Sequence, residues 1–426
     1  TRLYPPSVAM MIKRSLCAVP ALLALFSVCV DAADWSQYRG IAGDGKSNEV
    51  IGQADWSSSG PNVLWKVPTP LGFSSFSVAD GRAFTVIAED SKEMVVAIDA
   101  NSGEELWRVP MGSSDYDQGG GNAGAPDNKG GDGPRSTPAV DGNRVYVYDS
   151  YMVLRCLDAS TGRQVWEHDV VAENAGRNIK WLNATSPIID GELVYVGGGG
   201  AGESFLALNK NDGQVVWKSG DETITHATPT LATIGEKKQL IFFVQSGLVS
   251  VDAATGSELW RTEFPFSVST AASPVVEGDH VYCSAGYGVG AGHFRIEGNS
   301  KVDEVWFKPN ELMNHWSTPV VHNGHLYGIF EFKKYGRAPL QCVDLATGEI
   351  KWAQRGFGPG NCILVGEKLV VLSDAGEVAI VAAQPDSYQE LARADVLDGK
   401  CWSTPAYSDG HIFVRSTKEA ACIAID

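Results

Sequence analysis

The chain has 426 residues, 44% of them hydrophobic and 20% charged, and 51 acidic residues against 34 Lys and Arg give a formal net charge of −17. This composition fits a folded globular protein, and the negative charge argues against nucleic acid or anionic lipid as a partner. A chain of this length would ordinarily form two or three domains, but an internal repeat that runs through nearly all of it predicts one closed domain.

The first 32 residues have the pattern of an export signal. Met10 or Met11, followed by basic residues, fits the true start of the protein better than Thr1. Residues 16–30 then form an apolar run, which is too short for a comfortable membrane span and has the length of a signal-peptide core. We therefore expect residues 1–32 to be upstream residues and a signal peptide.

The small residues before Ala33 predict cleavage at that point. A lipid anchor at Cys29 is not expected, because residues 26–28 form a poor lipobox. The predicted product is an exported protein of the periplasm or the extracellular space that is not an integral membrane protein. Its residues 33–60 read as a polar, Gly-containing lead-in segment.

A motif of Asp or Asn, Gly and Trp, spaced four residues apart, predicts a series of β-hairpins. The side chain of Asp or Asn can bond the backbone just ahead of it, and Gly supplies the positive φ of a tight turn. The Trp begins the next strand and is expected to be a structural docking residue. The five copies are Asp99/Gly103/Trp107, Asp158/Gly162/Trp166, Asn209/Gly213/Trp217, Asp252/Gly256/Trp260 and Asp344/Gly348/Trp352.

A second marker, a Ser/Thr-Pro step before a short strand, defines the repeating unit. The prolines stand at 138, 187, 229, 274, 319 and 405, while Cys362 takes the place of Pro in one unit and a divergent unit begins at Phe73. The spacing predicts eight units of four strands, the last of which lacks its fourth strand. Residues 61–68 supply that strand, which would remove free sheet edges. We predict an all-β, eight-bladed β-propeller over residues 61–426, with the N-terminal strand completing the last blade.

Three other sequence features are not interpreted as binding or catalytic sites. The Gly- and Asp-rich insertion at 111–134 matches no calcium loop, so a flexible surface loop is expected. The GxGxxG pattern at 197–202 runs into another strand rather than a helix, so it is interpreted as a hairpin loop. His322 and His325 flank an Asn-Gly turn and are expected to decorate it.

The cysteines point to packing more than to chemistry. Cys156 and Cys342 occupy the same position of the repeat and are expected to be small core residues. Cys362 and Cys401 belong to the starts of neighbouring inner strands, so a disulfide between them is compatible with the exported location.

Polar and aromatic residues precede several inner strands and are predicted to converge on one mouth of the central channel. They are Arg135, Trp181, Asn183, His226, His315, Trp316, Lys400 and Trp402. Such a set suits an anionic or planar ligand, held by charge and by stacking. The alternative is that these residues only plug and solvate the channel.

The repeat AxDxxTGxxxW, the eight units and the closing N-terminal strand resemble the pyrroloquinoline quinone (PQQ) repeat propellers, which include BamB-like proteins and quinoprotein alcohol dehydrogenases. WSQYRG, GPNVLWKVP and GDGPRSTPAVDGNRVYV resemble exported bacterial members of this group. The dehydrogenases imply an adjacent Cys-Cys pair, a calcium site and a catalytic Asp. This sequence has no Cys-Cys pair and no CxxCH haem motif, and no calcium-ligand set can be matched residue by residue.

Three functions remain open at this point. The first is a non-catalytic binding or scaffold module in the cell envelope, whose partners are envelope proteins or polymers and which needs no cofactor. The second is a PQQ- and calcium-dependent alcohol dehydrogenase with a divergent site. The third is a propeller that binds a small ligand or a carbohydrate at the mouth.

Overall fold

A computed structural model of the chain describes residues 1–4, 34–52, 54, 56, 60–116, 133–268, 270–334 and 336–425. The chain divides into two compact units, residues 1–31 and 32–426. The second unit holds every strand that the described residues form. The predicted signal peptide, Cys29 and most of the insertion at 111–134 lie outside the described residues.

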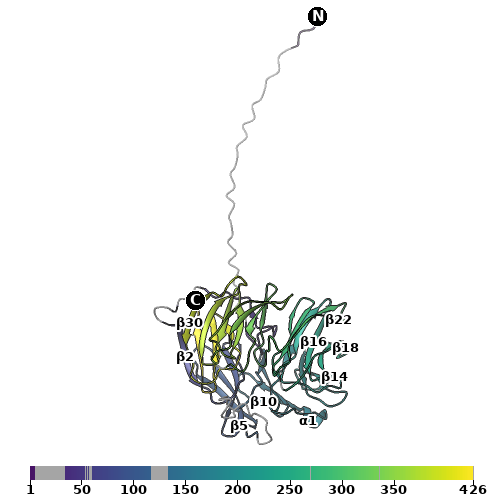
Figure 1. Ribbon diagram of the computed structural model, residues 1–426, viewed down its shortest axis with the longest axis vertical. Helices are drawn as coiled ribbons and strands as arrows, with labels where there is room; N and C mark the ends of the chain where they lie inside the picture. The colour runs from purple at the N-terminus through teal and green to yellow at the C-terminus, as the bar shows by residue number, and fades with distance from the viewer. Residues whose placement is uncertain are drawn as a thin grey trace. The chain divides into compact units, whose positions relative to one another are not determined.

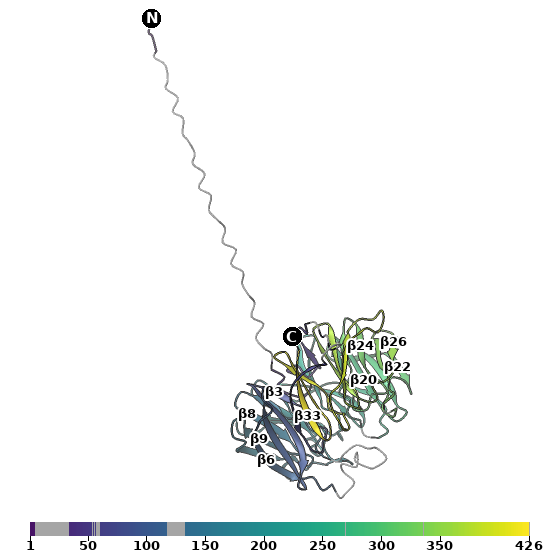
Figure 2. The same cartoon turned by 90° about the vertical axis from the view of Figure 1, so that its left-hand side faces the viewer.

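Eight sheets of mainly antiparallel strands, here called blades A to H, make up the second unit (Figure 1, Figure 2). Each of blades A to G pairs four consecutive strands in chain order. Blade A consists of β3 (Ser77–Ala79), β4 (Arg82–Glu89), β5 (Lys92–Asp99) and β6 (Glu105–Ser113), and blade B of β7 (Ala139–Asp141), β8 (Arg144–Tyr148), β9 (Val153–Asp158) and β10 (Gln164–Asp169). Blade C consists of β11 (Ile188–Asp190), β12 (Leu193–Gly197), β13 (Phe205–Asn209) and β14 (Val215–Ser219), and blade D of β15 (Thr230–Ile234), β16 (Lys237–Val244), β17 (Gly247–Asp252) and β18 (Glu258–Glu263).

Blade E consists of β19 (Val275–Glu277), β20 (His280–Ala285), β21 (Gly290–Glu297) and β22 (Lys301–Pro309), and blade F of β23 (Val320–His322), β24 (His325–Ile329), β25 (Leu340–Asp344) and β26 (Ile350–Gln354). Blade G contains β27 (Asn361–Val365), β28 (Lys368–Leu372), β29 (Glu377–Ala382) and β30 (Glu390–Asp395), and blade H contains β31 (Ala406–Ser408), β32 (His411–Arg415) and β33 (Glu419–Ala424). A short helix, α1 (Val170–Glu173), follows blade B. The all-β, eight-bladed β-propeller is confirmed.

The predicted closing strand completes blade H. Strand β2 (Asn62–Pro68) pairs antiparallel with β33, from Asn62 opposite Ala424 to Pro68 opposite Glu419. It therefore lies among the yellow strands of the C-terminal end in Figure 1. Trp65 of this strand is buried, so the closure also contributes a large side chain to the core.

The repeat Trp residues dock each blade on the next one. Except in Trp260, the indole nitrogen donates to a backbone carbonyl of the next blade, as in Trp107 to Ala159 and Trp217 to Ala253, both at 3.0 Å. Trp260 instead donates to the Gln239 side chain of its own blade. The turn Gly packs against the same ring, because a Cβ at Gly256 would lie 2.4 Å from Trp217. The structural role predicted for the motif is thus confirmed. Blade E does the same with Trp306, which donates to Leu345 and which the fixed spacing missed.

Ser75 and several residues of the Ser/Thr-Pro steps form hydrogen bonds between neighbouring blades. A backbone N–H of one blade donates to the hydroxyl at the equivalent position of the next blade. The bonds run from Thr404 to Ser75, from Ser75 to Thr137, from Thr137 to Ser186, from Ser186 to Thr228 and from Ser273 to Thr318, over 2.8 to 3.0 Å. Because these groups are buried, the hydrogen bonds satisfy backbone donors that would otherwise be costly.

The first part of the lead-in segment packs against inner strands of the propeller. Trp35 is buried and bridges Val78 of blade A, and the N–H of Val140 in blade B donates to the carbonyl of Ser36 over 2.7 Å. Strand β1 (Lys46–Ser47) then pairs parallel with the inner strand β27 of blade G. The lead-in thus joins inner strands on different sides of the channel, at the end where those strands finish.

Arg39 anchors the lead-in from within the channel. Its side chain is buried and donates to the carbonyls of Thr318 and Pro319 in blade F, with donor–acceptor distances of 2.9 Å in both bonds. Burial lowers the pKa of the Arg39 guanidinium. Hydrogen bonds to these carbonyl groups offset the free-energy cost of burying the charge. The sequence did not predict this anchor.

The cysteines in the described residues are all free thiols. Cys156 and Cys342 are buried in the cores of blades B and F, as expected. Cys362 and Cys401 are buried and unbonded, so the disulfide between them is not formed. No helix within the described ranges is long and apolar enough to cross a membrane.

Candidate functional site

The mouth is the end of the channel where the inner strands begin. The eight residues predicted for it lie there, just before β7, β11, β15, β23 and β31. Their contacts form two groups. One is an aromatic arc over blades E, F, G, H and A, and the other is a smaller cluster over blades B, C and D.

The centre of the aromatic arc is a stack of three rings. Trp402 stands between Phe73 and Trp316, with ring centroids 5.1 and 4.3 Å apart and interplanar angles of 24° and 30°. Trp316 and Trp402 come from blades F and H, and they meet above blade G. There the chain runs Gly358-Pro359-Gly360, and the Pro359 carbonyl accepts a 2.9 Å hydrogen bond from the Trp316 indole.

The arc continues over blades E and F. Phe332 lies against His315, with centroids 4.8 Å apart, and against Tyr287 at 4.9 Å. The ammonium of the exposed Lys333 lies 4.4 Å from the centroid of the Tyr287 ring, which is cation–π distance. Phe73, Tyr287, Phe332 and Lys333 were missed by sequence reasoning. Only Phe73 lies just before an inner strand, while the others follow second strands, where the repeat carries no marker.

The second cluster holds Arg135, Trp181 and His226. The Arg135 guanidinium donates to the Trp181 carbonyl over 2.9 Å, and the rings of Trp181 and His226 are 6.4 Å apart. Trp181 and Leu182 both adopt positive φ, 70° and 61°. Backbone strain of this kind costs about 1–3 kcal/mol per residue and persists only where surrounding contacts hold it. The Arg135 contact is one such restraint.

The two histidines of the mouth are neutral. Burial lowers the pKa of His226 to about 3, and the positive charge of Arg135 adds to the effect. Burial also lowers the pKa of His315 to about 3, with a contribution from Lys333. His226 Nε2 and His315 Nδ1 are buried without a hydrogen-bond partner among the described residues.

Two of the predicted residues are tied into the scaffold. Asn183 is buried, and its amide donates to the Asp149 carbonyl over 3.1 Å while its oxygen accepts from Thr185 N–H. Lys400 lies 3.9 Å from the buried carboxylate of Asp374 and 5.6 Å from the Trp402 ring. Asn183 therefore shapes the loop, whereas Lys400 adds positive charge beside the arc. A ligand-binding role for the eight residues stays a prediction.

The mouth is a poor fit for PQQ with calcium. Trp402 already stacks on Phe73 and on Trp316, so neighbouring rings occupy much of the indole surface on which a planar cofactor would stack. Within the part of the chain that the structure describes, no three His, Cys, Asp or Glu side chains are grouped to hold a metal ion. We derive no chemical step through this cofactor.

Two curated relatives and one solved structure illustrate the similarity. The chain is 25% identical over 292 residues to outer membrane protein assembly factor BamB of Yersinia pestis, covering 65% of this chain and 70% of that protein. It is 31% identical over 147 residues to the quinoprotein ethanol dehydrogenase of Pseudomonas aeruginosa, covering 31% of this chain but 23% of the enzyme. The crystal structure of BamB from Moraxella catarrhalis superposes with a TM-score of 0.58 at 14% identity, over 88% of this chain and all of that one.

These likenesses agree with the match to a family model. The structural likeness supports the fold alone, because the sequence identity is low. The family model described as outer membrane protein assembly factor BamB matches residues 91–354, which is more than half of the chain. On this ground the chain belongs to the BamB-like family of PQQ-repeat propellers.

Proposed function

We propose that this chain is an exported, non-catalytic β-propeller that acts as a binding or scaffold module in the cell envelope, with the mouth as its contact surface. The observation that carries the proposal is the aromatic arc. Its rings are packed on one another and bordered by Lys333 and Lys400, so it is a rigid surface of aromatic and cationic groups. Buried aromatic side chains with neighbouring cations are typical anchors of protein interfaces.

The electrostatics of the mouth support a role without catalysis. A general base works best when its pKa lies near the working pH. The pKa values of His226 and His315, both about 3, leave these imidazoles neutral and weakly basic at neutral pH. Membership of a family named for outer membrane assembly supports the envelope location.

A second candidate is a quinoprotein dehydrogenase with a divergent site. The 31% identity to the quinoprotein ethanol dehydrogenase over 147 residues favours it. The stacking of Trp402 on Phe73 and on Trp316 disfavours it, because these rings occupy the indole surface that a planar cofactor would use. Dye-coupled alcohol oxidation with added PQQ and Ca²⁺ separates the two functions. Turnover above that of the protein alone would replace the scaffold function by the dehydrogenase.

The scaffold function is tested by a charge reversal at the mouth. Lys333→Glu changes an exposed side chain of the arc, and Lys351→Glu makes the same change on the outer strand of blade F. Each variant is crosslinked in an envelope extract of the source organism, and captured proteins are quantified by mass spectrometry. We expect parent and Lys351→Glu to capture the same partner and Lys333→Glu to lose about tenfold, which corresponds to about 1.4 kcal/mol. Equal capture by both variants would show that the mouth is not the contact surface.

A further inference from the structure

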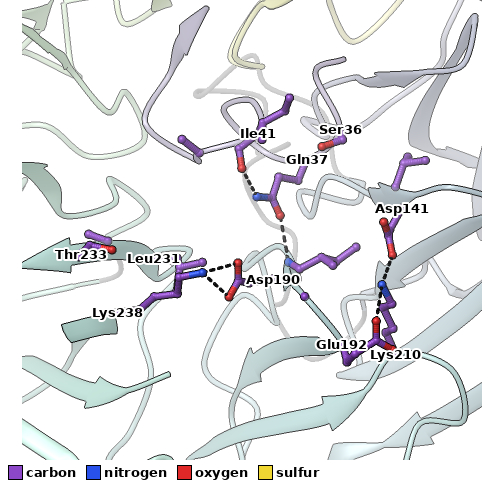
Figure 3. Close-up of a pocket in the computed structure, with 15 residues that line it drawn as sticks. Ser36, Gln37, Ile41, Asp141, Asp190, Glu192, Lys210, Leu231, Thr233 and Lys238 are labelled. Carbon is purple, nitrogen blue, oxygen red and sulfur yellow. Dashed lines mark hydrogen bonds and ion pairs between the residues drawn. The ribbon is translucent and has the colours of Figure 1, made fainter. Parts of the chain in front are cut away.

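The end of the channel opposite the mouth carries a pocket of about 550 Å³ (Figure 3). It lies between the lead-in and the ends of the inner strands of blades B, C and D, where Asp141, Asp190 and Thr233 line it. A pocket of this size accommodates a small molecule or a few side chains of a partner protein.

The pocket has an apolar part that the lead-in and three blades build together. Val140, Ile189 and Leu231 come from the inner strands β7, β11 and β15, and Ile41 comes from the lead-in. Val140 is buried, whereas Ile41 is 58% exposed. Gln37 holds the lead-in here, because its oxygen accepts from the Ile189 N–H over 3.0 Å, as Figure 3 shows. The aliphatic stem of a long side chain could pack against this surface.

Carboxylates outnumber ammonium groups around the pocket. The Lys210 nitrogen lies 2.6 Å from Asp141 and 3.4 Å from Glu192, and the Lys238 nitrogen lies 2.8 and 2.9 Å from the two oxygens of Asp190 (Figure 3). Three carboxylates therefore face two ammonium groups, which leaves one negative charge in excess. The Glu192 side chain is 71% exposed and is the most accessible of the three carboxylates.

The pocket belongs to a wider acidic ring. In every blade except F, the last residue of the inner strand or the turn that follows it carries at least one Asp or Glu, such as Asp80 in blade A, Asp141 in blade B and Glu236 in blade D. The mouth at the other end carries Lys333 and Lys400 beside its aromatic arc. The two ends of the channel thus differ in composition, because one carries aromatic rings and the other carries acidic residues at the inner-strand ends.

We propose that this pocket receives a basic side chain, Arg or Lys, from a segment of a partner protein. The stem would pack on Ile41 and Leu231, and the cation would lie near Glu192 and Asp190. The acidic ring would raise the local concentration of a cationic segment and speed its encounter. Within the described ranges no three acidic or His/Cys side chains are placed to hold a metal ion, so a basic side chain fits better than a divalent cation.

This inference rests on the proposed function as a binding module, but it concerns a different surface from the mouth. The probe is a fluorescein-labelled peptide, Gly-Ser-Leu-Arg-Leu-Arg-Ser-Gly, and its control has Glu at both Arg positions. Fluorescence anisotropy measures the dissociation constant at low salt and at about 0.5 M salt, where exposed charges are screened. Glu192→Gln removes the accessible carboxylate, and Glu104→Gln removes one exposed carboxylate from an outer turn of blade A, so both change the net charge equally.

We expect the parent to bind the Arg peptide in preference to the Glu peptide, more weakly at high salt. Glu192→Gln should weaken binding about fivefold to tenfold, and Glu104→Gln by less than about twofold. Equal effects of the two variants would assign binding to the overall charge, and no preference for Arg would overturn the proposal. Loss of peptide binding in Lys351→Glu or Lys333→Glu would also contradict it. Failure of the mouth experiment leaves this result unaffected, so the two proposals fail separately.

Discussion

The docking of each hairpin turn on the Trp of the preceding blade predicts a specific cost for Gly256→Ala. Gly256 has φ of +71°, and a Cβ there would lie 2.4 Å from the Trp217 ring. Gly278 offers a matched control, because it has φ of +61° and no atom within 4 Å of an added Cβ. Both substitutions place Ala in the left-handed region, and only the first also strikes a neighbouring blade.

The magnitude follows from these contacts. The left-handed conformation costs about 1–2 kcal/mol for a residue with a Cβ, and this cost is common to both variants. Displacing Trp217 adds about 1–3 kcal/mol for overpacking and about 1 kcal/mol for its hydrogen bond to the Ala253 carbonyl. We therefore expect Gly256→Ala to lower the free energy of unfolding by about 2–4 kcal/mol more than Gly278→Ala does.

Urea unfolding followed by far-UV circular dichroism measures this difference without depending on Trp fluorescence. Both variants and the parent are compared at one pH and one salt concentration. Equal losses in the two variants would refute the docking argument, since the turn conformation alone would then explain the whole effect.

Two further predictions concern the closing strand and a buried carboxyl. Trp65→Ala should lower the free energy of unfolding by about 3–5 kcal/mol, because Trp65 is buried in blade H and bonds the Ala100 carbonyl. Leu64→Ala, at a 42% exposed side chain of the same strand, should cost about 0.5 kcal/mol or less, and similar losses in urea unfolding would contradict the closure. Burial raises the pKa of Glu93 to about 6 from an ordinary 4.5, so its ionisation destabilises the folded protein as pH rises through this range. Relative to the parent, Glu93→Gln should therefore gain about 2 kcal/mol between pH 4 and pH 7, and a pH-independent difference in urea unfolding would contradict the shift.

The aromatic arc illustrates a limit of sequence reasoning about the site. The sequence placed Trp316 and Trp402 at the mouth. It did not predict that the two rings stack on each other above blade G. Their contact is accompanied by a hydrogen bond from the Trp316 indole to the Pro359 carbonyl, which no repeat position marks. Phe332 and Tyr287 were missed because they lie outside the repeated positions that the sequence pattern marks.

The sequence by itself determined the fold, since the motif of Asp, Gly and Trp and the Ser/Thr-Pro step are short patterns with local causes. Each is a turn or a docking contact that recurs in successive blades, so its spacing counts the blades and identifies the strand that closes them. Only the tertiary structure decided where the lead-in lies, because Arg39 finds its carbonyl partners 279 and 280 residues away in blade F. The acidic pocket also arose at this level, because it needs three inner-strand ends and the lead-in to meet around one axis.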